Sequence, residues 1–401
     1  KGTDLARFSC YLLGNCIWER WILETGLYIH VPFCVKKCNY CDFISYPYYE
    51  ADVKAYLVGL EQEMKLYSQS PVFQSREIST VYIGGGTPTC LSAFNLGKII
   101  NDVFKYFHVY TGAEVTMEAN PGTVSPHLLA SVQAAGVNRL SLGVQSCRED
   151  ELRLLGRIHS FRQTEETFLM AREAGLHNIG VDLISGLPGQ SALDWMETLK
   201  TIIALKPDHV SAYGLQLEAG TPLYEDVQNG LLAPCSEEEE LEMFLQTGDF
   251  FANHGFDHYE ISNFATPGRQ CRHNLMYWYN QEYLGIGPAA HSYMNGCRYA
   301  NEVQIYAYKD ALDAGCLPVT SQEKIDTATE MAETVFLGLR LLKGLSLECF
   351  KRRFGCAIDE VYPGPLQKLT DIGLVESTGG YLRLTRRGLP VANRVFIEFL
   401  P

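Results

Sequence analysis

Residues 30–43 read HVPFCVKKCNYCDF and place Cys34, Cys38 and Cys41 in a C-x3-C-x2-C spacing just after a short, β-rich run. Three thiolates on one compact loop can ligate three irons of a [4Fe–4S] cube, which leaves the fourth iron without a protein ligand. A metal with an open coordination position can bind a substrate group, as catalytic metal sites do. The spacing therefore predicts a [4Fe–4S] cluster with one exchangeable iron.

A structural zinc ion is the alternative for this loop. Zinc needs four ligands, and proteins usually supply them as paired Cys and His sets. The chain has no second C-x2-C pair, and His30 is the only nitrogen ligand close to the loop. The sequence favours the cluster over zinc for these reasons.

The composition is that of an ordinary globular protein. The 401 residues suggest two or three domains, and 46% of them are hydrophobic and 20% charged. The net charge of −14 argues against broad contact with nucleic-acid phosphates, which requires clustered Lys and Arg. Thirteen cysteines scattered along the chain favour a reducing compartment, in which they serve as metal ligands or core residues.

An alternation of β-rich runs and amphipathic helical stretches begins at Leu27 and continues to about Glu218. The expected strands are Leu27–Val31, Thr80–Ile83, Glu114–Glu118, Arg139–Val144, Ile179–Ile184 and His209–Leu217. The expected helices include Lys54–Tyr67, Leu96–Phe107, Thr164–Ala174 and Leu193–Leu205. Six such units predict an α/β fold, a partial (β/α)6 barrel whose chemistry lies at the carboxyl ends of its strands.

The alternation divides the chain into four expected parts. We assign no role to an N-terminal extension over 1–26, and we expect the partial barrel over 27–255. Residues 256–320 form an aromatic-rich connecting region, and 321–401 form a C-terminal mixed α+β domain. Helices followed by a hairpin at Gly379-Gly380 make that last part winged-helix-like, and the acidic charge favours a structural role over DNA binding.

Polar and glycine residues follow successive predicted strands. The second strand ends in Gly84-Gly85-Gly86-Thr87, where the backbone can approach a ligand closely. The next strands end at Glu118, Gln145 and Asp182, and Arg157 follows Gln145 along the chain. A carboxylate can accept hydrogen bonds from both ribose hydroxyls, and an arginine can pair with a carboxylate bidentately. We expect these groups to form one ligand site at the top of the barrel.

The cysteine loop and the motifs after it resemble those of the radical S-adenosylmethionine (SAM) superfamily. In that superfamily the open iron chelates the amino and carboxylate groups of SAM, and reduction of the cluster cleaves SAM to a 5′-deoxyadenosyl radical. The resemblance implies a partial radical SAM barrel with SAM contacts at Tyr28, Tyr40, Gly85, Gly86, Thr87, Glu118, Gln145, Arg157 and Asp182.

Across residues 27–400 the chain resembles the oxygen-independent coproporphyrinogen III oxidase family and its relatives. The matching phrases include LYIHVPFCVKKCNYCDF, VYIGGGTPT, EVTMEANPGT, VDLISGLPGQ and HYEISNF. The oxidase branch carries a further cysteine two positions after the third cluster cysteine, where this chain has Phe43. The heme chaperone HemW branch carries an HNxxYW motif, which reads HNLMYW at 273–278 in this chain. The chaperone branch is therefore favoured, and a radical SAM decarboxylase of porphyrin biosynthesis is the alternative.

The chaperone resemblance implies a heme site at His273, Asn274, Tyr277 and Trp278. A histidine can ligate iron, and aromatic rings offer flat apolar faces to a macrocycle. From the residues alone, a histidine beside aromatics is more often a hydrogen-bonded core residue. His291 and His258 are further candidate ligands.

The same resemblance implies heme, apo-heme-proteins and an electron donor for the cluster as partners, and no nucleic acid. Respiratory, membrane-associated proteins are expected among the heme recipients. The expected location is the cytoplasm, and contact with the membrane surface, the oligomeric state and any catalytic residue are left open. Nucleic-acid modification is a third alternative, against which the net charge counts.

Overall fold

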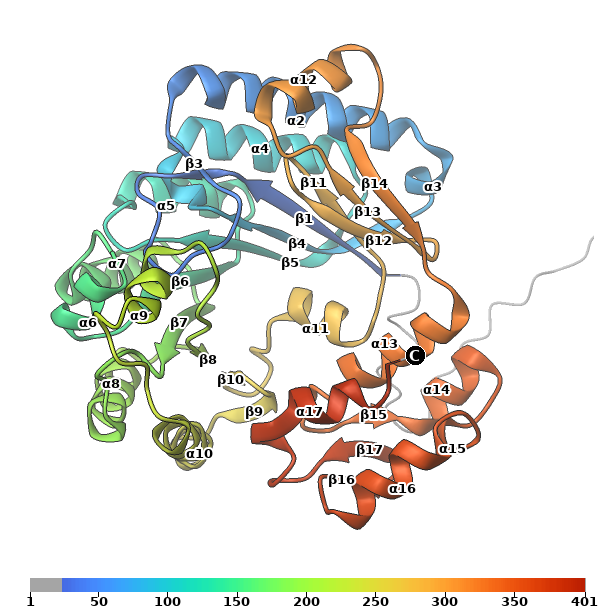
Figure 1. Ribbon diagram of the computed structural model, residues 1–401. Helices are drawn as coiled ribbons and strands as arrows, with labels where there is room; N and C mark the ends of the chain where they lie inside the picture. The colour runs from blue at the N-terminus through green and yellow to red at the C-terminus, as the bar shows by residue number, and fades with distance from the viewer. Residues whose placement is uncertain (1–23, 401) are drawn as a thin grey trace, which may run out of the picture.

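The computed structural model describes residues 24–400, and twelve of its strands form one curved sheet (Figure 1). Most of the extension expected over 1–26 lies outside the described residues, while Glu24–Gly26 belong to the first strand. The strand order is β14-β13-β12-β11-β1-β4-β5-β6-β7-β8-β10-β9. Helices cover the outer side of the arc.

The six expected β/α units form the middle of this sheet. Their strands lie side by side in chain order and are all parallel. The strands are β1 (Glu24–Val31), β4 (Glu77–Gly85), β5 (Val109–Ala119), β6 (Arg139–Gln145), β7 (Ile179–Ser185) and β8 (His209–Gly214). The helices between them are α2 (Glu50–Gln69), α3 (Pro71–Gln74), α4 (Ala93–Tyr106), α5 (Pro126–Ala135), α6 (Glu149–Leu154), α7 (Phe161–Glu173) and α8 (Ala192–Ala204). The predicted partial (β/α)6 barrel is confirmed.

The sequence signals for these units are local. Parallel strands are buried on both faces, and β7 is accordingly apolar except for Asp182 and Ser185. Ser160 and Ser191 cap α7 and α8 through capping boxes with Gln163 and Asp194. These caps fix the residues at which α7 and α8 begin, and therefore the ends of the loops that precede the two helices.

The aromatic-rich region extends both edges of the sheet, a role that its sequence pattern did not predict. At one edge β10 (Asn263–Ala265) pairs with β8, and β9 (Asp257–Glu260) pairs with β10. At the other edge β11 (Tyr283–Ile286) lies parallel to β1 and is followed by the antiparallel strands β12 (His291–Met294), β13 (Cys297–Asn301) and β14 (Val319–Lys324). Helix α11 (Arg272–Trp278) connects the two edges on the open side of the arc (Figure 1).

The C-terminal part has its own core and a three-stranded sheet of order β15-β17-β16. Its elements are α13 (Thr327–Gly338), β15 (Leu345–Ser346), α14 (Leu347–Phe354), α15 (Ile358–Val361), α16 (Pro363–Asp371), β16 (Val375–Thr378), β17 (Tyr381–Leu384) and α17 (Ala392–Ile397). Helices followed by a β16–β17 hairpin give the expected winged-helix-like arrangement. The remaining helices and strands are β2 (Phe33–Cys34), β3 (Tyr46–Pro47), α9 (Pro222–Gln228), α10 (Glu237–Asn253) and α12 (Ile305–Asp313). No described helix combines the length and hydrophobicity needed to cross a bilayer.

A fully buried carboxyl group joins the first helix of the barrel to the added edge. Glu63 on α2 accepts hydrogen bonds from the Gly287 backbone N–H at 2.8 Å, the Asn301 side-chain amide at 2.7 Å and the Tyr308 hydroxyl at 2.6 Å. Burial raises the pKa of Glu63 to about 7, although all three hydrogen bonds favour its charged form. The segment that contains β11 to β13 and α12 is therefore linked to α2 by a carboxyl group that titrates near neutral pH.

Replacing this carboxyl by an amide tests the linkage. The folded-state pKa of Glu63 lies above its unfolded value, so its contribution to stability is present below about pH 4.5 and is lost as the pH rises to about 7. We expect the free energy of unfolding of Glu63→Gln, relative to wild type, to increase by up to about 3 kcal/mol between pH 5 and pH 8. Urea unfolding at both pH values measures this, and Glu50→Gln, at an exposed position of the same helix, is the control. A relative stability that does not change with pH would contradict the linkage.

Candidate functional site

The cysteine loop and the glycine loop lie side by side because the β1–β4 pairing continues past the strands. Val31 pairs with Gly85, and the Gly86 N–H then donates to the Val31 carbonyl at 2.9 Å. The Thr87 N–H donates to the Phe33 carbonyl at 2.7 Å. The residues that precede Cys34 are thus hydrogen-bonded to the glycine loop.

This approach is so close that only glycine fits. A Cβ at Gly86 would lie 2.5 Å from the Phe33 carbonyl oxygen, which is well inside contact distance. A Cβ at Gly84 would lie 2.8 Å from the Glu118 carboxyl carbon. Gly85 has a φ of +108°, which residues with a side chain rarely adopt.

The three predicted cluster cysteines share one half-buried neighbourhood. Cys34 Sγ lies 3.6 Å from Thr87 Oγ1, and Arg157 Nη1 donates to Cys38 Sγ at 3.3 Å. Burial raises the pKa of Cys41, and the charges of Cys38 and Cys34 add to that effect. The three sulfur atoms are therefore close enough to influence one another.

The three thiols of the loop are free and supply the type of donor that an iron–sulfur cluster takes. Within residues 24–400, no group of three or more His, Cys, Asp or Glu side chains is placed to hold a metal ion. Three thiols are one ligand fewer than a tetrahedral zinc site requires. The residues present fit a [4Fe–4S] cluster, and the assignment of the three ligands stays a prediction.

Asn39, inside the cysteine loop, anchors the loop to the segment that carries Arg157. Its backbone N–H donates to the Leu155 carbonyl at 3.0 Å, and its side-chain amide donates to the Leu154 carbonyl at 2.9 Å. Its own carbonyl accepts from the Leu223 N–H at 2.9 Å. Sequence reasoning missed Asn39 because its role depends on contacts with segments far along the chain.

Arg157 reaches from this segment into the interior of the barrel. Its Nη2 atom donates to the Gly143 carbonyl at 2.6 Å, while its buried Nε has no hydrogen-bond partner. A buried donor without a partner is costly and suits a site that a ligand completes. The guanidinium could pair with a carboxylate there, as the resemblance implies.

Glu118 lies opposite, at the end of β5. It accepts hydrogen bonds from the Tyr82 hydroxyl at 2.8 Å and the Gly85 N–H at 3.1 Å. Burial raises its pKa to about 7, and the nearby charge of Asp182 adds to the shift. A carboxyl with such a pKa lacks full compensation for its charge, so it suits a ligand that brings N–H or O–H donors.

Asp182 and Gln145 complete the row of groups at the strand ends. Asp182 accepts from Ser141 Oγ at 3.0 Å, and burial raises its pKa. Gln145 ends β6 with a φ of +68°, an uncommon conformation for a residue with a side chain. Such strain persists only where neighbouring contacts hold it, and it clusters at functional sites.

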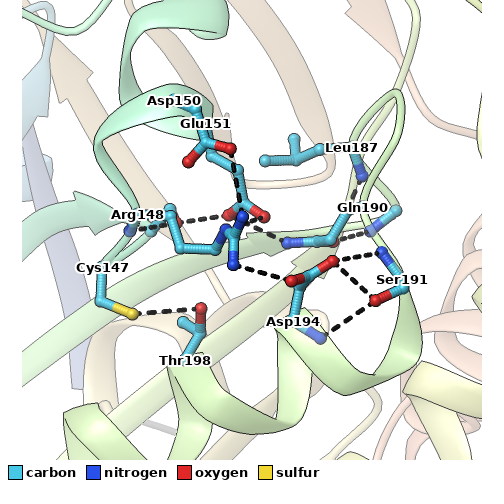
Figure 2. Close-up of polar contacts among 11 residues, drawn as sticks. Cys147, Arg148, Asp150, Glu151, Leu187, Gln190, Ser191, Asp194 and Thr198 are labelled. Carbon is cyan, nitrogen blue, oxygen red and sulfur yellow. Dashed lines mark hydrogen bonds and ion pairs between the residues drawn. The ribbon is translucent and has the colours of Figure 1, made fainter.

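A polar network after β6 holds this turn (Figure 2). Ser146 Oγ and Gln190 Nε2 both donate to the Glu151 carboxylate. Gln190 Oε1 in turn accepts from the backbone N–H groups of Gly186 and Leu187, at 2.9 and 3.3 Å. The network thus joins the loops that follow β6 and β7. The LPGQ phrase in the sequence is the signal that could have identified Gln190.

An arginine extends this network to α8. Arg148 pairs with Asp194 at 2.7 Å and with Asp150 at 3.2 Å, as Figure 2 shows. Cys147 Sγ donates to Thr198 Oγ1 at 3.3 Å. These contacts tie the segment that follows Gln145 to α8.

Of the two tyrosines predicted to contact SAM, Tyr28 lies on β1 and Tyr40 lies within the cysteine loop, between Cys38 and Cys41. The Tyr28 hydroxyl is 3.0 Å from His30 Nδ1, and burial raises its pKa. Tyr40 packs beside Leu155 and Leu187, and burial raises its pKa while Arg157 opposes the shift. The residues predicted to hold SAM therefore come from elements that meet at the carboxyl ends of β1 to β7.

Comparison with known proteins decides the family. The Radical SAM superfamily model matches residues 28–202, and the HemN C-terminal domain model matches residues 325–391. The chain is 37% identical to the heme chaperone HemW of Bacillus subtilis over 93% of its own length and 98% of the relative's. It is 35% identical to HemW of Mycobacterium tuberculosis over 92% and 93% of the two chains. The chain belongs to the HemW family of radical SAM proteins.

The solved structures agree on the fold. Coproporphyrinogen III oxidase (HemN) from Escherichia coli, described as a radical SAM enzyme, superposes with a TM-score of 0.82 over 96% of this chain and 93% of its own. Sequence identity with it is 23%, so the likeness shows the shared fold alone. That fold includes the sheet and the small C-terminal domain.

In the HNxxYW motif, His273 is enclosed by protein. Its Nδ1 lies 2.8 Å from Thr80 Oγ1, its Nε2 lies 2.9 Å from the Tyr277 hydroxyl, and its ring stacks on Tyr82 at 5.2 Å between centroids. Burial, assisted by the charge of Arg139, lowers the pKa of His273 to about 3. Ligation of heme iron by His273 stays a prediction, and it would require the ring to leave one of these partners.

The other candidate heme residues differ in accessibility. Trp278 lies beneath the Arg340 guanidinium at 4.3 Å, and Asn274 is half-buried next to His273. His258 Nε2 lies 3.1 Å from the Ile261 carbonyl. His291, at the start of β12, is exposed.

Removing any one cluster thiol tests the metal site. We expect Cys34→Ala, Cys38→Ala and Cys41→Ala to lose iron and the charge-transfer absorption at about 400 nm, because each thiolate holds a different iron. Cys316→Ala, at an exposed cysteine elsewhere, should keep both. Iron analysis and absorption spectra after anaerobic reconstitution measure the effect. Full iron content in the three loop variants would contradict the assignment.

A methyl group on the glycine loop tests the SAM site. Gly86→Ala should force the cysteine and glycine loops apart and weaken SAM binding at least about tenfold, a loss of about 1.4 kcal/mol. Gly97→Ala is the matched control, because a Cβ there on α4 meets no atom within 4 Å. Equilibrium dialysis with labelled SAM gives both affinities, and equal affinities would argue against ligand contact at this loop.

Proposed function

We propose that this chain is a heme chaperone that holds a SAM-coordinating [4Fe–4S] cluster and delivers heme to apo-proteins. The observation that carries the proposal is its similarity, over nearly the full length of both chains, to relatives named heme chaperone HemW. Similarity of this extent covers the cysteine loop, the barrel, the HNxxYW motif and the C-terminal domain together.

Phe43 supports the chaperone over the decarboxylase. The oxidase branch is expected to carry a cysteine at this position, two residues after Cys41. The Phe43 side chain is 64% exposed and offers neither a thiol nor a proton to a substrate beside the cluster. The alternative activity, decarboxylation of coproporphyrinogen III, therefore lacks one of its expected groups.

The cluster and SAM, when bound, supply reductive cleavage of SAM. The chain's own groups hold and orient the ligand. Gly85 and Gly86 allow close backbone approach, and Glu118 offers a carboxyl that is protonated or charged near neutral pH. Arg157 offers a cation beside the Cys38 thiol. These groups can bind SAM whether its cleavage drives heme transfer or only gates it.

The expected partners follow from the proposal. They are heme, apo-heme-proteins, including respiratory and membrane-associated ones, and an electron donor for the cluster. A cytoplasmic chaperone that meets such recipients would work next to the membrane without crossing it.

Heme binding and transfer test the function directly. We expect the reconstituted protein to bind hemin at micromolar concentration with a shifted Soret band, and to transfer it to an apo-cytochrome faster than heme-loaded serum albumin does. An anaerobic assay with SAM, a reductant and coproporphyrinogen III is the second arm, in which we expect no protoporphyrinogen. Absence of hemin binding, or protoporphyrinogen formed over many turnovers, would rule out the chaperone proposal.

A further inference from the structure

Helix α11 presents different side chains to two sides. His273, Met276 and Tyr277 face the barrel sheet, where His273 and Met276 both contact Thr80. Arg272, Leu275 and Tyr279, spaced by three and four residues, line a cavity on the other side. The motif histidine and this cavity therefore lie on opposite faces of one helix turn.

The cavity lies where the barrel meets the C-terminal domain. Its volume is about 820 Å³, within the range of sites that enclose a cofactor. Strand β9 and α11 form one wall, and the segment Leu341–Cys349 with the tip of the β16–β17 hairpin forms the other. Both parts of the chain are needed to form it, and the SAM-site residues do not line it.

Aromatic and aliphatic groups supply much of its lining. Tyr279 and Tyr381 lie near each other, and Leu275, Leu341 and Leu347 add apolar surface. Burial, with the nearby groups Tyr381 and Cys349, raises the pKa of Tyr279 to about 12, which keeps its ring neutral. Such a lining suits a large, flat and mostly apolar ligand.

Charged groups sit at its more exposed parts. Lys343 Nζ lies 4.7 Å from the Tyr381 ring centroid, and Arg272 lines the cavity from α11. Asp257 and Glu348 are also in the lining and are exposed. The two cations can pair with carboxylates on the edge of a ligand.

One soft ligand for iron also faces the cavity. Cys349 is half-buried in the first turn of α14, and its thiol accepts a long hydrogen bond of 3.9 Å from Arg352 Nη2. A cysteine thiolate is one of the common axial ligands of heme iron. His258, which also lines the cavity, already has its Nε2 engaged by the Ile261 carbonyl.

We propose that this cavity binds the heme, with Cys349 as an axial ligand, the rings of Tyr279 and Tyr381 against the macrocycle, and Lys343 and Arg272 at the propionates. The proposal rests on the proposed chaperone function and specifies where its cargo lies. It places heme on the face of α11 opposite to His273, at the seam between the barrel and the C-terminal domain.

Hemin titration of the reconstituted full chain, followed at the Soret band, tests this site. We expect Cys349→Ser to move the Soret maximum and to weaken binding about tenfold or more, because an alcohol is a poor iron ligand. Lys343→Met should weaken binding without moving the maximum, since it removes a propionate partner and leaves the iron ligand. Cys316→Ser is the matched cysteine control and should bind hemin as wild type does.

A second variant keeps the test independent of the axial ligand. Leu347→Trp fills the cavity and should abolish hemin binding while SAM affinity stays unchanged, which also shows that the variant is folded. Wild-type binding with unaltered spectra and affinities in Cys349→Ser and Leu347→Trp would overturn the site and leave the chaperone function standing. Loss of the Soret band in His273→Gln alone would overturn it too and place the heme at the motif histidine. No binding by wild type would instead remove the function itself.

Discussion

Continuation of the β1–β4 hydrogen bonds beyond the ends of the strands is the constraint on which the site depends. The bonds from Gly86 to Val31 and from Thr87 to Phe33 fix the start of the cysteine loop against the glycine loop. A larger residue at Gly86 would collide with the backbone that it must contact. Once this pairing is set, the thiol of Cys34 and the backbone of the glycine loop must occupy the same end of the barrel. A ligand held by one is then within reach of the other.

Two buried glutamates illustrate how the same fold uses one physical effect in two ways. Burial raises the pKa of both Glu63 and Glu118 to about 7. Three protein donors surround Glu63, so its carboxyl is completed by the protein and joins α2 to the edge strands. Glu118 has two protein donors and a neighbouring acid, Asp182. Its carboxyl group can therefore accept further hydrogen bonds from a ligand. The difference in partners, not in pKa, separates the structural group from the one predicted to bind a ligand.

The parts of the fold that sequence could predict are those with local signals. Buried parallel strands such as β7 are mostly apolar, and helices such as α8 begin at a capping serine, so the six units could be placed. Strand β11 has four residues and acquires its role only by pairing with β1, more than 250 positions earlier in the chain. The cysteines, glycines and Glu118 could be predicted from motif and position. Asn39 could not, because it joins segments that only the folded chain brings together. The LPGQ phrase could single out Gln190, but not its contact with Glu151.

Helix α11 is the element in which the two proposed ligand sites come closest to sharing parts. On one side, the ring of His273 stacks on Tyr82, whose hydroxyl donates to Glu118 in the SAM site. On the other side, Tyr279 at the end of the same helix lines the seam cavity. Coupling between two ligands requires an element whose position both of them affect. A short helix held between the two sites meets that requirement, because any shift of α11 that the Glu118 side favours also moves a wall of the cavity. This arrangement gives a physical reason for the full HNxxYW motif to be present even though its histidine is already satisfied within the protein.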